Sequence, residues 1–548
     1  MKNNTFFSIL ASISVAAVLL NACIKEPQPT NIATQEQVAA SPTALMASAR
    51  GIASLMSTAL IGGSDYAFDM SYPGLMIMLD TAAGEIVDTG NTGYDWYSYW
   101  SQPISGLGEN YVLSAVPWRA QYKLIKAAND VIGAVDPAQA TEDQKIALGQ
   151  ALGFRAQFYL NMARMYEYKA PTDPKVDPTY KPAGNIAGLT VPLVTEKTTQ
   201  EAARNNPRAT VDQIYKQIFD DLDLAETYLD GTKSTTDVAP SLAVIYGIKA
   251  RAFLERGSAG VAGAFASAAQ YARKAIDAFG GSPLTQAQWE DPTNGFNNAA
   301  ANKNSWMWYI HYDEENIGNL YTFVAHMAPE ETWTSYGWSV GRGINKSLYE
   351  KIADTDFRKH SWIDPDGKQF YDYKTNRDVF GKTKTLKAYC NLKFRPAHGN
   401  CDVWKTGGAS EVPLMRVEEM MLIEAEALAL AGDLPAGKAA LNALINTRDA
   451  DYSCDNVANT FAFQREVFLQ KRIELWGEGL IYFDAKRLET GIRNGYLGTN
   501  VQEGYRYTVT GVAPVWNFVI PRIEINANPA LDGLNNPDPT KAIDEWSE

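Results

Sequence analysis

The 548-residue chain has few of the residues that bind metals or perform nucleophilic catalysis. It contains four cysteines and four histidines, and the histidines (His311, His326, His360, His398) lie far apart in the sequence. No CxxC pair, HExxH, GxSxG or Walker sequence occurs. We therefore expect no zinc site and no known hydrolase or nucleotide-binding motif, and we interpret the histidines as surface or packing residues.

Positive charge is also in deficit. The chain has 49 Lys and Arg against 63 Asp and Glu, a net charge of -14. A surface this acidic argues against nucleic acid and anionic membrane surfaces as partners. With 46% hydrophobic residues, the chain can bury a large core as one large domain or two.

Only the N-terminus has a long apolar run. Residues 6–20 follow Lys2 and are too short for the ~20 residues that span a bilayer, so residues 1–22 are predicted to be a secretory signal. The run ends in Leu20-Asn21-Ala22-Cys23, which resembles the lipobox of bacterial lipoproteins. We predict lipidation of Cys23 and a flexible tether over residues 23–40. The alternative is an ordinary signal peptide with an incidental cysteine.

The remaining cysteines are Cys390, Cys401 and Cys454. An exported chain forms disulfides readily, so the sequence leaves open a bridge between Cys390 and Cys401. A polar loop with Asp372, Asn376 and Asp378 leaves a structural calcium open, although it lacks EF-hand spacing. No other cofactor is expected.

Helical periodicity dominates the rest of the chain. Apolar residues recur at helical spacing over 41–59, 115–135, 141–167, 209–229, 241–257, 265–280, 417–450 and 463–489. Thr141 is a predicted helix start, Thr210 with Gln213 forms a predicted capping box, and Gly432-Asp433 is a predicted turn. Helix pairs with small residues at their crossings are typical of tetratricopeptide-like (TPR-like) packing.

The helical rhythm breaks over about 281–412, where Asn, Gly, Trp and Tyr are frequent. We therefore predict a mainly α fold. A single domain spans residues 41–548, with a helical scaffold at about 41–280 and 413–490 and a loop-rich region at about 281–412 that forms the ligand-binding face.

Several segments in a fixed order resemble the SusD/RagB family of outer-membrane nutrient-binding lipoproteins. The C-terminal ones are RVEEMMLIEAEALALAG, ALNALINTRDA, LQKRIELWGEGLIYFDAKRL and FVIPRIEINANPAL; a middle one is LYEKIADTDFRKHSW; the N-terminal ones are PWRAQYKLIKAANDVI, ALGQALGFRAQFYLNMARMYE, GLTVPLV and PRATVDQIYKQIFDDLDLAETYL. The chain departs from the family at Gln470-Lys471-Arg472, where Glu-Arg-Arg is usual, and at Leu480-Ile481, where a basic residue is usual. The resemblance therefore implies no specific salt bridge there.

This resemblance implies a lipoprotein anchored in the outer membrane and exposed on the cell surface. Such a protein caps a SusC-like TonB-dependent transporter, captures a glycan and delivers it to the barrel, without catalysis. Two alternatives stay open: a peptide-binding RagB-like member of the same uptake system, and a TPR-type scaffold for protein partners.

A glycan site needs exposed aromatic rings beside amides, carboxylates and arginine, because sugar rings stack on aromatic faces. The chain has 13 Trp and 28 Tyr against 20 Phe, an excess of rings with a polar group. Two clusters lie in loop-like sequence. The predicted ligand contacts are Asn91, Tyr94, Trp96 and Trp100 in the first cluster, and Tyr321, Trp333, Tyr336, Trp338 and Arg342 in the second. The alternative is that these rings pack the loops onto the scaffold.

Other features of these regions favour structural roles. SWMWYIHY alternates as a strand does, and we expect Trp306 in the core. The adjacent acid pairs Glu314-Glu315, Glu330-Glu331 and Glu418-Glu419 do not have the flanking geometry of a glycosidase, because neighbouring side chains point apart. We therefore predict that the protein is not an enzyme.

Overall fold

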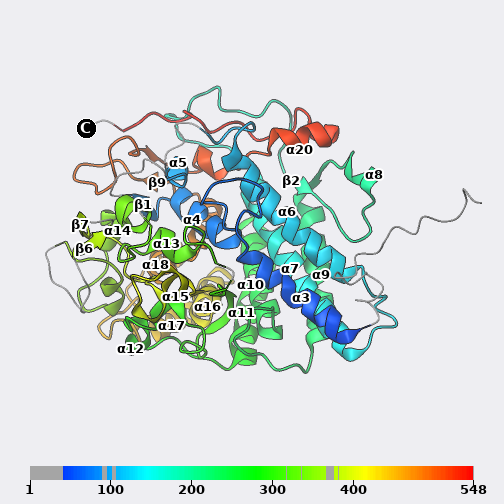
Figure 1. Cartoon of the computed structure of the whole chain (residues 1–548), viewed down its shortest axis with the longest axis horizontal. Coiled ribbons are helices and arrows are strands. Elements are labelled where there is room, and N and C mark those ends of the chain that lie inside the picture. The colour runs from blue at the N-terminus through cyan, green and yellow to red at the C-terminus, as the bar shows by residue number, and fades with distance from the viewer. Residues whose placement is uncertain are drawn as a thin grey trace, which may run out of the picture.

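Long helices form the scaffold of the protein (Figure 1). The computed structural model describes residues 41–88, 95–101, 106–315, 317–334, 336–365, 376–379 and 382–546. Its longer helices are α3 (Pro42–Met56), α4 (Tyr72–Ala82), α6 (Val112–Ile132), α7 (Glu142–Tyr166), α9 (Val211–Leu229), α10 (Leu242–Ser258), α11 (Ala264–Phe279), α16 (Val417–Leu430), α17 (Leu434–Ile445), α18 (Thr460–Glu474) and α19 (Ile481–Leu488). The predicted mainly α fold is confirmed.

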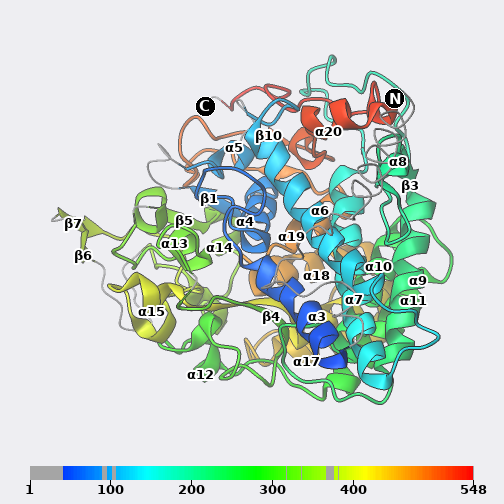
Figure 2. The same cartoon turned by 45° about the vertical axis from the view of Figure 1, so that its right-hand side comes forward.

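The long helices pack in succession, as TPR-like units do. Helix α6 lies on α7, α7 on α9, α10 on α11, α11 on α16, and α16 on α17. Figure 2 shows α3, α6 and α7 side by side, with α9 and α11 at the edge of the molecule. Helix α7 lies between its neighbours and is buried from Ala147 to Tyr166.

Shorter elements connect the scaffold and cover one side of it. They are α5 (Ser98–Ser101), α8 (Gln200–Ala203), α12 (Gln286–Trp289), α13 (Phe323–Met327), α14 (Lys346–Tyr349), α15 (Trp404–Gly408), α20 (Arg522–Ala527), η1 (Gly295–Asn297), η2 (Tyr336–Gly341), η3 (Phe357–Ser361), η4 (Ala397–Gly399), η5 (Pro514–Trp516) and η6 (Pro529–Leu531). Most of them lie between residues 281 and 412, the region predicted to be rich in loops.

The strands form short antiparallel pairs. They are β1 (Ile86–Asp88) with β5 (Arg342–Ile344), β2 (Leu189–Pro192) with β3 (Arg208–Thr210), β4 (Trp306–His311) with β8 (Glu411–Arg416), β6 (Asn376–Val379) with β7 (Lys382–Thr385), and β9 (Ile492–Arg493) with β10 (Thr508–Val509). Strand β4 is the predicted SWMWYIHY strand, and Trp306 is fully buried as expected.

Local capping explains where several helices begin. The side chain of Thr141 accepts a hydrogen bond from Gln144 N at the start of α7, and Gln144 completes a capping box. Thr210 and Gln213 form the predicted capping box of α9. These contacts satisfy amide groups that have no partner within the helix. The predicted turn at Gly432-Asp433 is also present, between α16 and α17.

The helical segment predicted over 463–489 is divided into two helices in the structure. Helix α18 ends at Glu474 and α19 begins at Ile481. Between them Gly477 and Gly479 adopt φ values of 77° and 72°, a region that disfavours other residues. A Cβ on Gly479 would lie 2.6 Å from the Cα of Met76, so this break allows close contact with α4.

A cluster of buried ions joins the C-terminal helices to the loop-rich region. This ionic cluster contains the cations Arg358, Lys393, Arg416 and Arg448 and the carboxylates Asp356, Glu418, Glu474 and Glu478. Glu474 lies at its centre: its oxygens are 3.1 Å from Arg358 Nη1, 3.2 Å from Arg416 Nη1 and 2.9 Å from Arg448 Nη2.

The residues that depart from the family pattern also have partners. Lys471 Nζ lies 2.7 Å from Glu426 Oε2, and Arg472 Nε lies 2.6 Å from Glu85 Oε1. The side-chain oxygen of Gln470 accepts from Arg358 at 2.7 Å. Cys390, Cys401 and Cys454 are buried thiols, so the structure does not contain the bridge between Cys390 and Cys401 that the sequence left open.

Candidate functional site

Three aromatic rings gather at the surface where the chain leaves β1 and approaches α5. The ring centroid of Trp96 lies 4.5 Å from that of Tyr66 and 5.8 Å from that of Tyr99, and the planes of Trp96 and Tyr99 differ by 26°. Tyr66 is 40% exposed, and Trp96 and Tyr99 are half-buried. We call these three residues the Trp96 cluster. It presents ring faces of the kind that bind the apolar face of a sugar.

Tyr97 anchors this segment to the core. Its side chain is buried and its hydroxyl donates to Phe68 O at 3.0 Å. The ring packs edge-on against His326, with centroids 5.4 Å apart. Because Tyr97 is fixed, its neighbour Trp96 is held at the surface.

The second predicted group lies close to the first. The ring of Tyr336 stacks on His326 at 4.5 Å, so His326 separates Tyr336 from Tyr97. Burial, and then the charge of Arg342, lower the pKa of His326 to about 3, so the imidazole is neutral at physiological pH. Tyr321 and Tyr336 are both half-buried and leave part of each ring accessible.

Trp333 and Trp338 are more engaged in packing. Trp338 Nε1 donates to Thr334 O at 2.9 Å, and its ring packs on a small core of Ile363, Leu386, Cys390 and Leu392. The backbone N–H of Trp333 donates to Glu331 at 2.8 Å. Both indoles are half-buried, so each presents only part of its surface to solvent.

The structure places Trp100 in the core, away from the surface on which it was predicted. The ring is 2% exposed and stacks on Phe518 at 4.5 Å, with 23° between the planes. The spacing of four residues from Trp96 does not put both rings on one accessible face, because only the short helix α5 follows Trp96.

Arg342 is also buried, contrary to its predicted contact with ligand. Its side chain is 0% exposed, it forms an ion pair with Asp95, and Nη1 donates to His326 O at 2.6 Å. The guanidinium carbon lies 5.1 Å from the centroid of the Tyr97 ring. Arg342 therefore contacts Asp95 and Tyr97, the two residues next to Trp96, and stabilises the segment that carries the Trp96 cluster.

A second carboxylate shares the surroundings of Arg342. Asp88 pairs with Arg342 in the β1–β5 register and is 1% exposed, yet neither of its carboxylate oxygens has a hydrogen-bond partner among the described residues. Burial, and then repulsion from Asp95, raises the pKa of Asp88 to about 8, although Arg342 opposes this shift. Burial also raises the pKa of Asp95, and Arg342 again acts in the opposite direction. We call Asp88 and Asp95 the acidic pair.

Sequence reasoning missed Tyr66. Its signal is weak, a single tyrosine in the segment GGSDYAFDMS between α3 and α4, and nothing local connects it to Trp96. Tyr99 lies within the aromatic segment but was not among the predicted contacts. The predicted contacts Asn91 and Tyr94, the predicted lipidation site Cys23, and Asp372 of the calcium loop lie outside the described residues.

The adjacent acid pairs serve structural contacts or face solvent. Glu330 pairs with Arg395, whose Nη2 lies 2.9 Å from Glu330 Oε1. Glu331 accepts from Thr334 N at 2.7 Å, and burial raises its pKa to about 7. Glu418 belongs to the ionic cluster, Glu419 lies 2.6 Å from Arg251 Nη2, and Glu314 and Glu315 are exposed.

Metal-binding clusters and membrane-spanning helices are both absent from the described residues. Over the described ranges, no group of three or more His, Cys, Asp or Glu side chains has the geometry to hold a metal ion. None of the helices described is both long and apolar enough to cross a bilayer.

Two family models match the sequence, and they include the predicted ligand contacts of both aromatic segments but not Tyr66. Residues 84–254 match a SusD-like family described as starch-binding and associating with the outer membrane, and residues 285–537 match the SusD family. No curated protein matches the sequence.

Solved structures of the same superfamily share the fold. A SusD-like carbohydrate binding protein from Bacteroides vulgatus is 19% identical, with a TM-score of 0.69 over 90% of this chain and 97% of the other. A SusD superfamily protein from Bacteroides thetaiotaomicron is 18% identical, with a TM-score of 0.64 over 91% of this chain and 100% of the other. Surface glycan-binding protein A from Bacteroides fluxus is 15% identical, with a TM-score of 0.62 over 91% and 98%. The chain belongs to the SusD family.

Proposed function

We propose that the protein is a cell-surface glycan-binding lipoprotein that captures an oligosaccharide or polysaccharide and passes it to a SusC-like TonB-dependent transporter of the outer membrane. The family description, starch-binding and associating with the outer membrane, supports this proposal. So do two relatives with the same fold, one named a carbohydrate binding protein and the other a surface glycan-binding protein.

The Trp96 cluster is the observation on which the proposal rests. Three rings within 6 Å of their neighbours form one aromatic surface, and Tyr97 fixes it to the core. Such a surface binds the C–H face of a sugar without an induced change of shape, so little conformational entropy is lost on binding. The half-buried Tyr321 and Tyr336 add hydroxyl groups for hydrogen bonds to the sugar.

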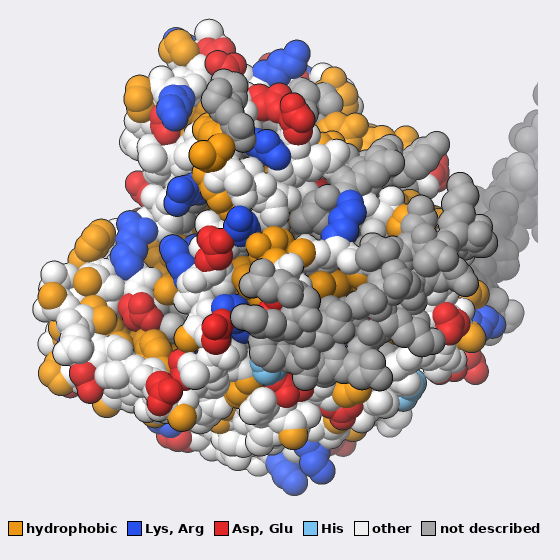
Figure 3. Space-filling view, turned by 90° about the vertical axis from the view of Figure 1, so that its left-hand side faces the viewer, with side chains coloured by type: hydrophobic (Ala, Val, Ile, Leu, Met, Phe, Trp, Pro, Cys, Tyr) orange, Lys and Arg blue, Asp and Glu red, His pale blue; other side chains and the backbone are white. Residues whose placement is uncertain are grey.

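Charge favours a ligand without strong net charge. The face shown in Figure 3 has Lys and Arg side chains beside Asp and Glu, with hydrophobic side chains between them. The whole chain has a net charge of -14, which disfavours polyanionic glycans at long range. A neutral glycan therefore fits better than a sulfated or uronate-rich one.

The membrane attachment and the partner follow from the N-terminus and the family. The lipobox-like Leu20-Asn21-Ala22-Cys23 supports anchoring through a lipid on Cys23, and the family resemblance supports a transporter as the recipient of the glycan. The engagement of Glu330, Glu331, Glu418 and Glu419 in structural contacts supports a role in binding without hydrolysis.

Native affinity electrophoresis tests the binding function. The full chain in mild detergent is run through gels that contain starch, other plant polysaccharides or host glycans. We expect retardation by one class, and Trp96→Ala should weaken it about tenfold, because one aromatic contact contributes about 0.5–1.5 kcal/mol beyond its buried area. Phe461→Ala is the matched control, since Phe461 is 67% exposed on α18 and should not affect binding.

Two results would contradict the proposal. Equal retardation of the Trp96→Ala variant and the wild type would exclude the Trp96 cluster as the site. Absence of retardation in every gel, together with binding to a peptide library, would favour the peptide-binding alternative. The transporter is tested separately by co-purification of a TonB-dependent barrel with the tagged chain from outer membranes.

A further inference from the structure

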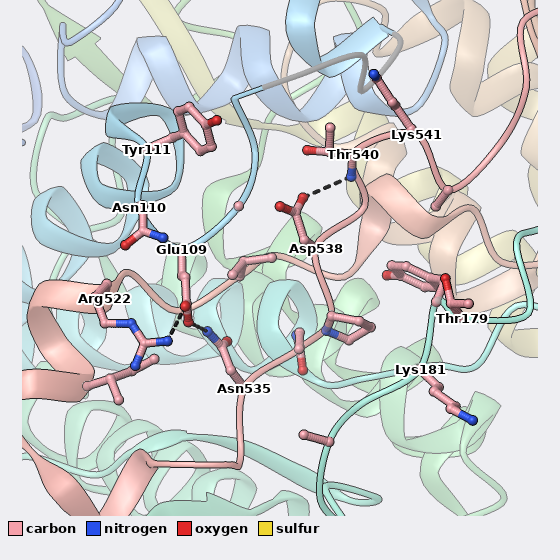
Figure 4. Close-up of a pocket in the computed structure, with 18 of the residues that line it drawn as sticks. Glu109, Asn110, Tyr111, Thr179, Lys181, Arg522, Asn535, Asp538, Thr540 and Lys541 are labelled. Atoms are coloured by element: carbon pink, nitrogen blue, oxygen red, sulfur yellow. Dashed lines mark hydrogen bonds and ion pairs between the residues drawn. The ribbon is translucent and has the colours of Figure 1, made fainter.

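A polar groove of about 580 Å³ lies between the start of α6, the loop 177–183 and the C-terminal segment 519–542 (Figure 4). Its lining shares no residue with the Trp96 cluster. The volume is within the usual range for pockets that hold small ligands.

The floor of the groove is held by one ionic network. Arg522 pairs with Glu109, and the backbone N–H of Arg522 donates to Glu109 O at 2.7 Å. Asn535 Nδ2 donates to Glu109 Oε2 at 3.2 Å and to Ile520 O at 2.9 Å. These contacts connect the start of α6 to the C-terminal segment, so the floor is preorganised.

The opposite wall is fixed by main-chain contacts. Asp177 N donates to Ala542 O at 2.9 Å, and the hydroxyl of Tyr180 donates to Pro514 O at 2.9 Å. One oxygen of Asp538 accepts from Thr540 N at 2.9 Å. The loop 177–183 and the C-terminal segment therefore form one wall that does not depend on a ligand.

The rim differs from the floor because its side chains are available. Tyr111 is 51% exposed, and it occupies the N-cap position just before α6 without a side-chain capping bond. The side chains of Tyr111, Lys181 and Lys541 have no hydrogen-bond or ion-pair partner in the part of the chain that the structure describes. Figure 4 shows Tyr111 and Lys541 on opposite sides of the upper part of the view and Lys181 at the lower right.

The backbone of Lys541 is also unusual. Its φ of 57° lies in the left-handed region, which is uncommon for residues other than glycine. Such conformations persist where the surrounding structure imposes them, and they concentrate at functional sites.

The charges around the groove select the class of ligand. Glu109 and Arg522 neutralise each other, and the lining also contains Lys181 and Lys541 together with the acids Asp177, Asp532 and Asp538. With both signs present and neither in clear excess, the groove offers donors and acceptors to a neutral, polyhydroxylated molecule. The ring of Tyr111 offers a stacking surface beside them.

We propose that this groove is a second glycan-binding site that takes neutral sugar residues. The inference rests on the proposed function, because it assumes that the chain meets glycans. A polysaccharide long enough to reach both sites gains avidity, since binding at one site raises the effective concentration of sugar at the other. A short oligosaccharide occupies the two sites independently.

Affinity electrophoresis of the full chain in detergent tests this site with starch, xylan, galactomannan and mixed-linkage β-glucan as neutral probes and pectin as an anionic one. Four variants are compared: Tyr111→Ala, Lys181→Ala, Trp96→Ala and the control Phe461→Ala. We expect Tyr111→Ala to weaken retardation by a neutral polysaccharide roughly three- to tenfold. Lys181→Ala should weaken it less and should leave the thermal midpoint unchanged, which separates lost binding from lost folding.

The outcomes separate the two sites. Loss in Trp96→Ala without loss in Tyr111→Ala and Lys181→Ala would overturn the second site and keep the first. Loss in Tyr111→Ala without loss in Trp96→Ala would support the groove and reject the Trp96 cluster. No retardation of the wild type by any probe, or retardation by pectin alone, would overturn the groove as a site for neutral sugars. Calorimetric titration with the oligosaccharide repeat of the bound polysaccharide should give two sites in the wild type and one in Tyr111→Ala.

Discussion

The helical scaffold contains the ionic cluster, and the segment that carries the Trp96 cluster packs on Arg342 and the acidic pair. The two sets of buried charges are paired to different degrees. In the ionic cluster, four cations meet four carboxylates, and Glu474 alone contacts Arg358, Arg416 and Arg448. The surrounding cations lower the pKa of Glu474, although burial acts in the opposite direction. Each carboxylate of the cluster lies within ion-pair distance of at least one of its four cations.

Below the Trp96 cluster the pairing is incomplete. Among the described residues, the acidic pair has one nearby cation, Arg342, which forms an ion pair with Asp95. Asp88 is left with no hydrogen-bond partner among the described residues, and its pKa is raised to about 8. Asp88 therefore keeps a proton in its buried position, whereas the carboxylates of the ionic cluster each lie beside a cation.

The two arrangements of buried charge have different consequences for stability. A fully paired network has one favourable arrangement, and breaking it exposes several charges at once, so it fixes the helices rigidly. A carboxyl that is protonated in the folded state lets the stability of its surroundings depend on pH. The stability of the segment that carries the Trp96 cluster therefore depends on a carboxyl whose charge changes with pH, whereas the charges that fix the helices are paired.

Removing one charge from the ionic cluster should have the largest effect. Glu474→Gln replaces an acceptor oxygen with an amide group that donates, so three arginines lose their shared counter-ion. We expect the free energy of unfolding to fall by about 3–5 kcal/mol. Urea unfolding followed by circular dichroism measures this loss.

A surface glutamate provides the control for that variant. Glu142 pairs with Lys145 at 2.8 Å, but its side chain is 87% exposed, so Glu142→Gln should leave the unfolding midpoint close to that of wild type. Equal midpoints for Glu474→Gln and wild type would show that the ionic cluster does not determine the stability of the scaffold.

The parts of the fold that sequence predicted well depend on local contacts. Thr141 and Thr210 cap their helices through residues three positions away, so the start of each helix is visible in the sequence. The break between α18 and α19 was missed because it depends on Gly479 meeting Met76, a residue about 400 positions away in the chain. Helical periodicity alone continues through that break.

The candidate site shows the same limit. Trp96 and Trp100 belong to one aromatic segment, yet Phe518 buries Trp100 and Tyr66 meets Trp96 at the surface. Arg342 lies between two glycines, a setting in which an accessible side chain is expected. Its side chain is buried because it pairs with Asp95, which is 247 positions away in the chain. Composition therefore predicted the aromatic segment, and long-range packing determines which of its rings are exposed.

Arg342→Met removes the cation that lies beside the acidic pair, so Asp88 and Asp95 both lose its charge. We expect a loss of about 3 kcal/mol at pH 8, at the low end for a broken buried pair, because a carboxyl can still take up a proton. At pH 5 the loss should be smaller, since burial favours the protonated forms of Asp88 and Asp95. Thermal unfolding at both pH values measures it, and equal losses at pH 5 and pH 8 would contradict this account.

The smallest effect is expected for Asp88→Asn, which keeps the shape of a protonated carboxyl and cannot ionise. The folded-state pKa of Asp88, about 8, lies above the ordinary value near 4. The wild type therefore binds an extra proton when folded, and its stability falls as pH rises between these values. The advantage of Asp88→Asn over wild type should grow by about 1 kcal/mol between pH 5.5 and pH 6.5.

Asp173→Asn separates this effect from the general consequences of removing a buried carboxylate. Burial would raise the pKa of Asp173, but hydrogen bonds from Lys175 and Thr510 outweigh it and lower the pKa, so Asp173 stays ionised at both pH values. Its variant should differ from wild type by the same amount at pH 5.5 and pH 6.5. If Asp88→Asn behaves in the same way, Asp88 is ionised in the folded protein, and the contrast between the acidic pair and the ionic cluster does not hold.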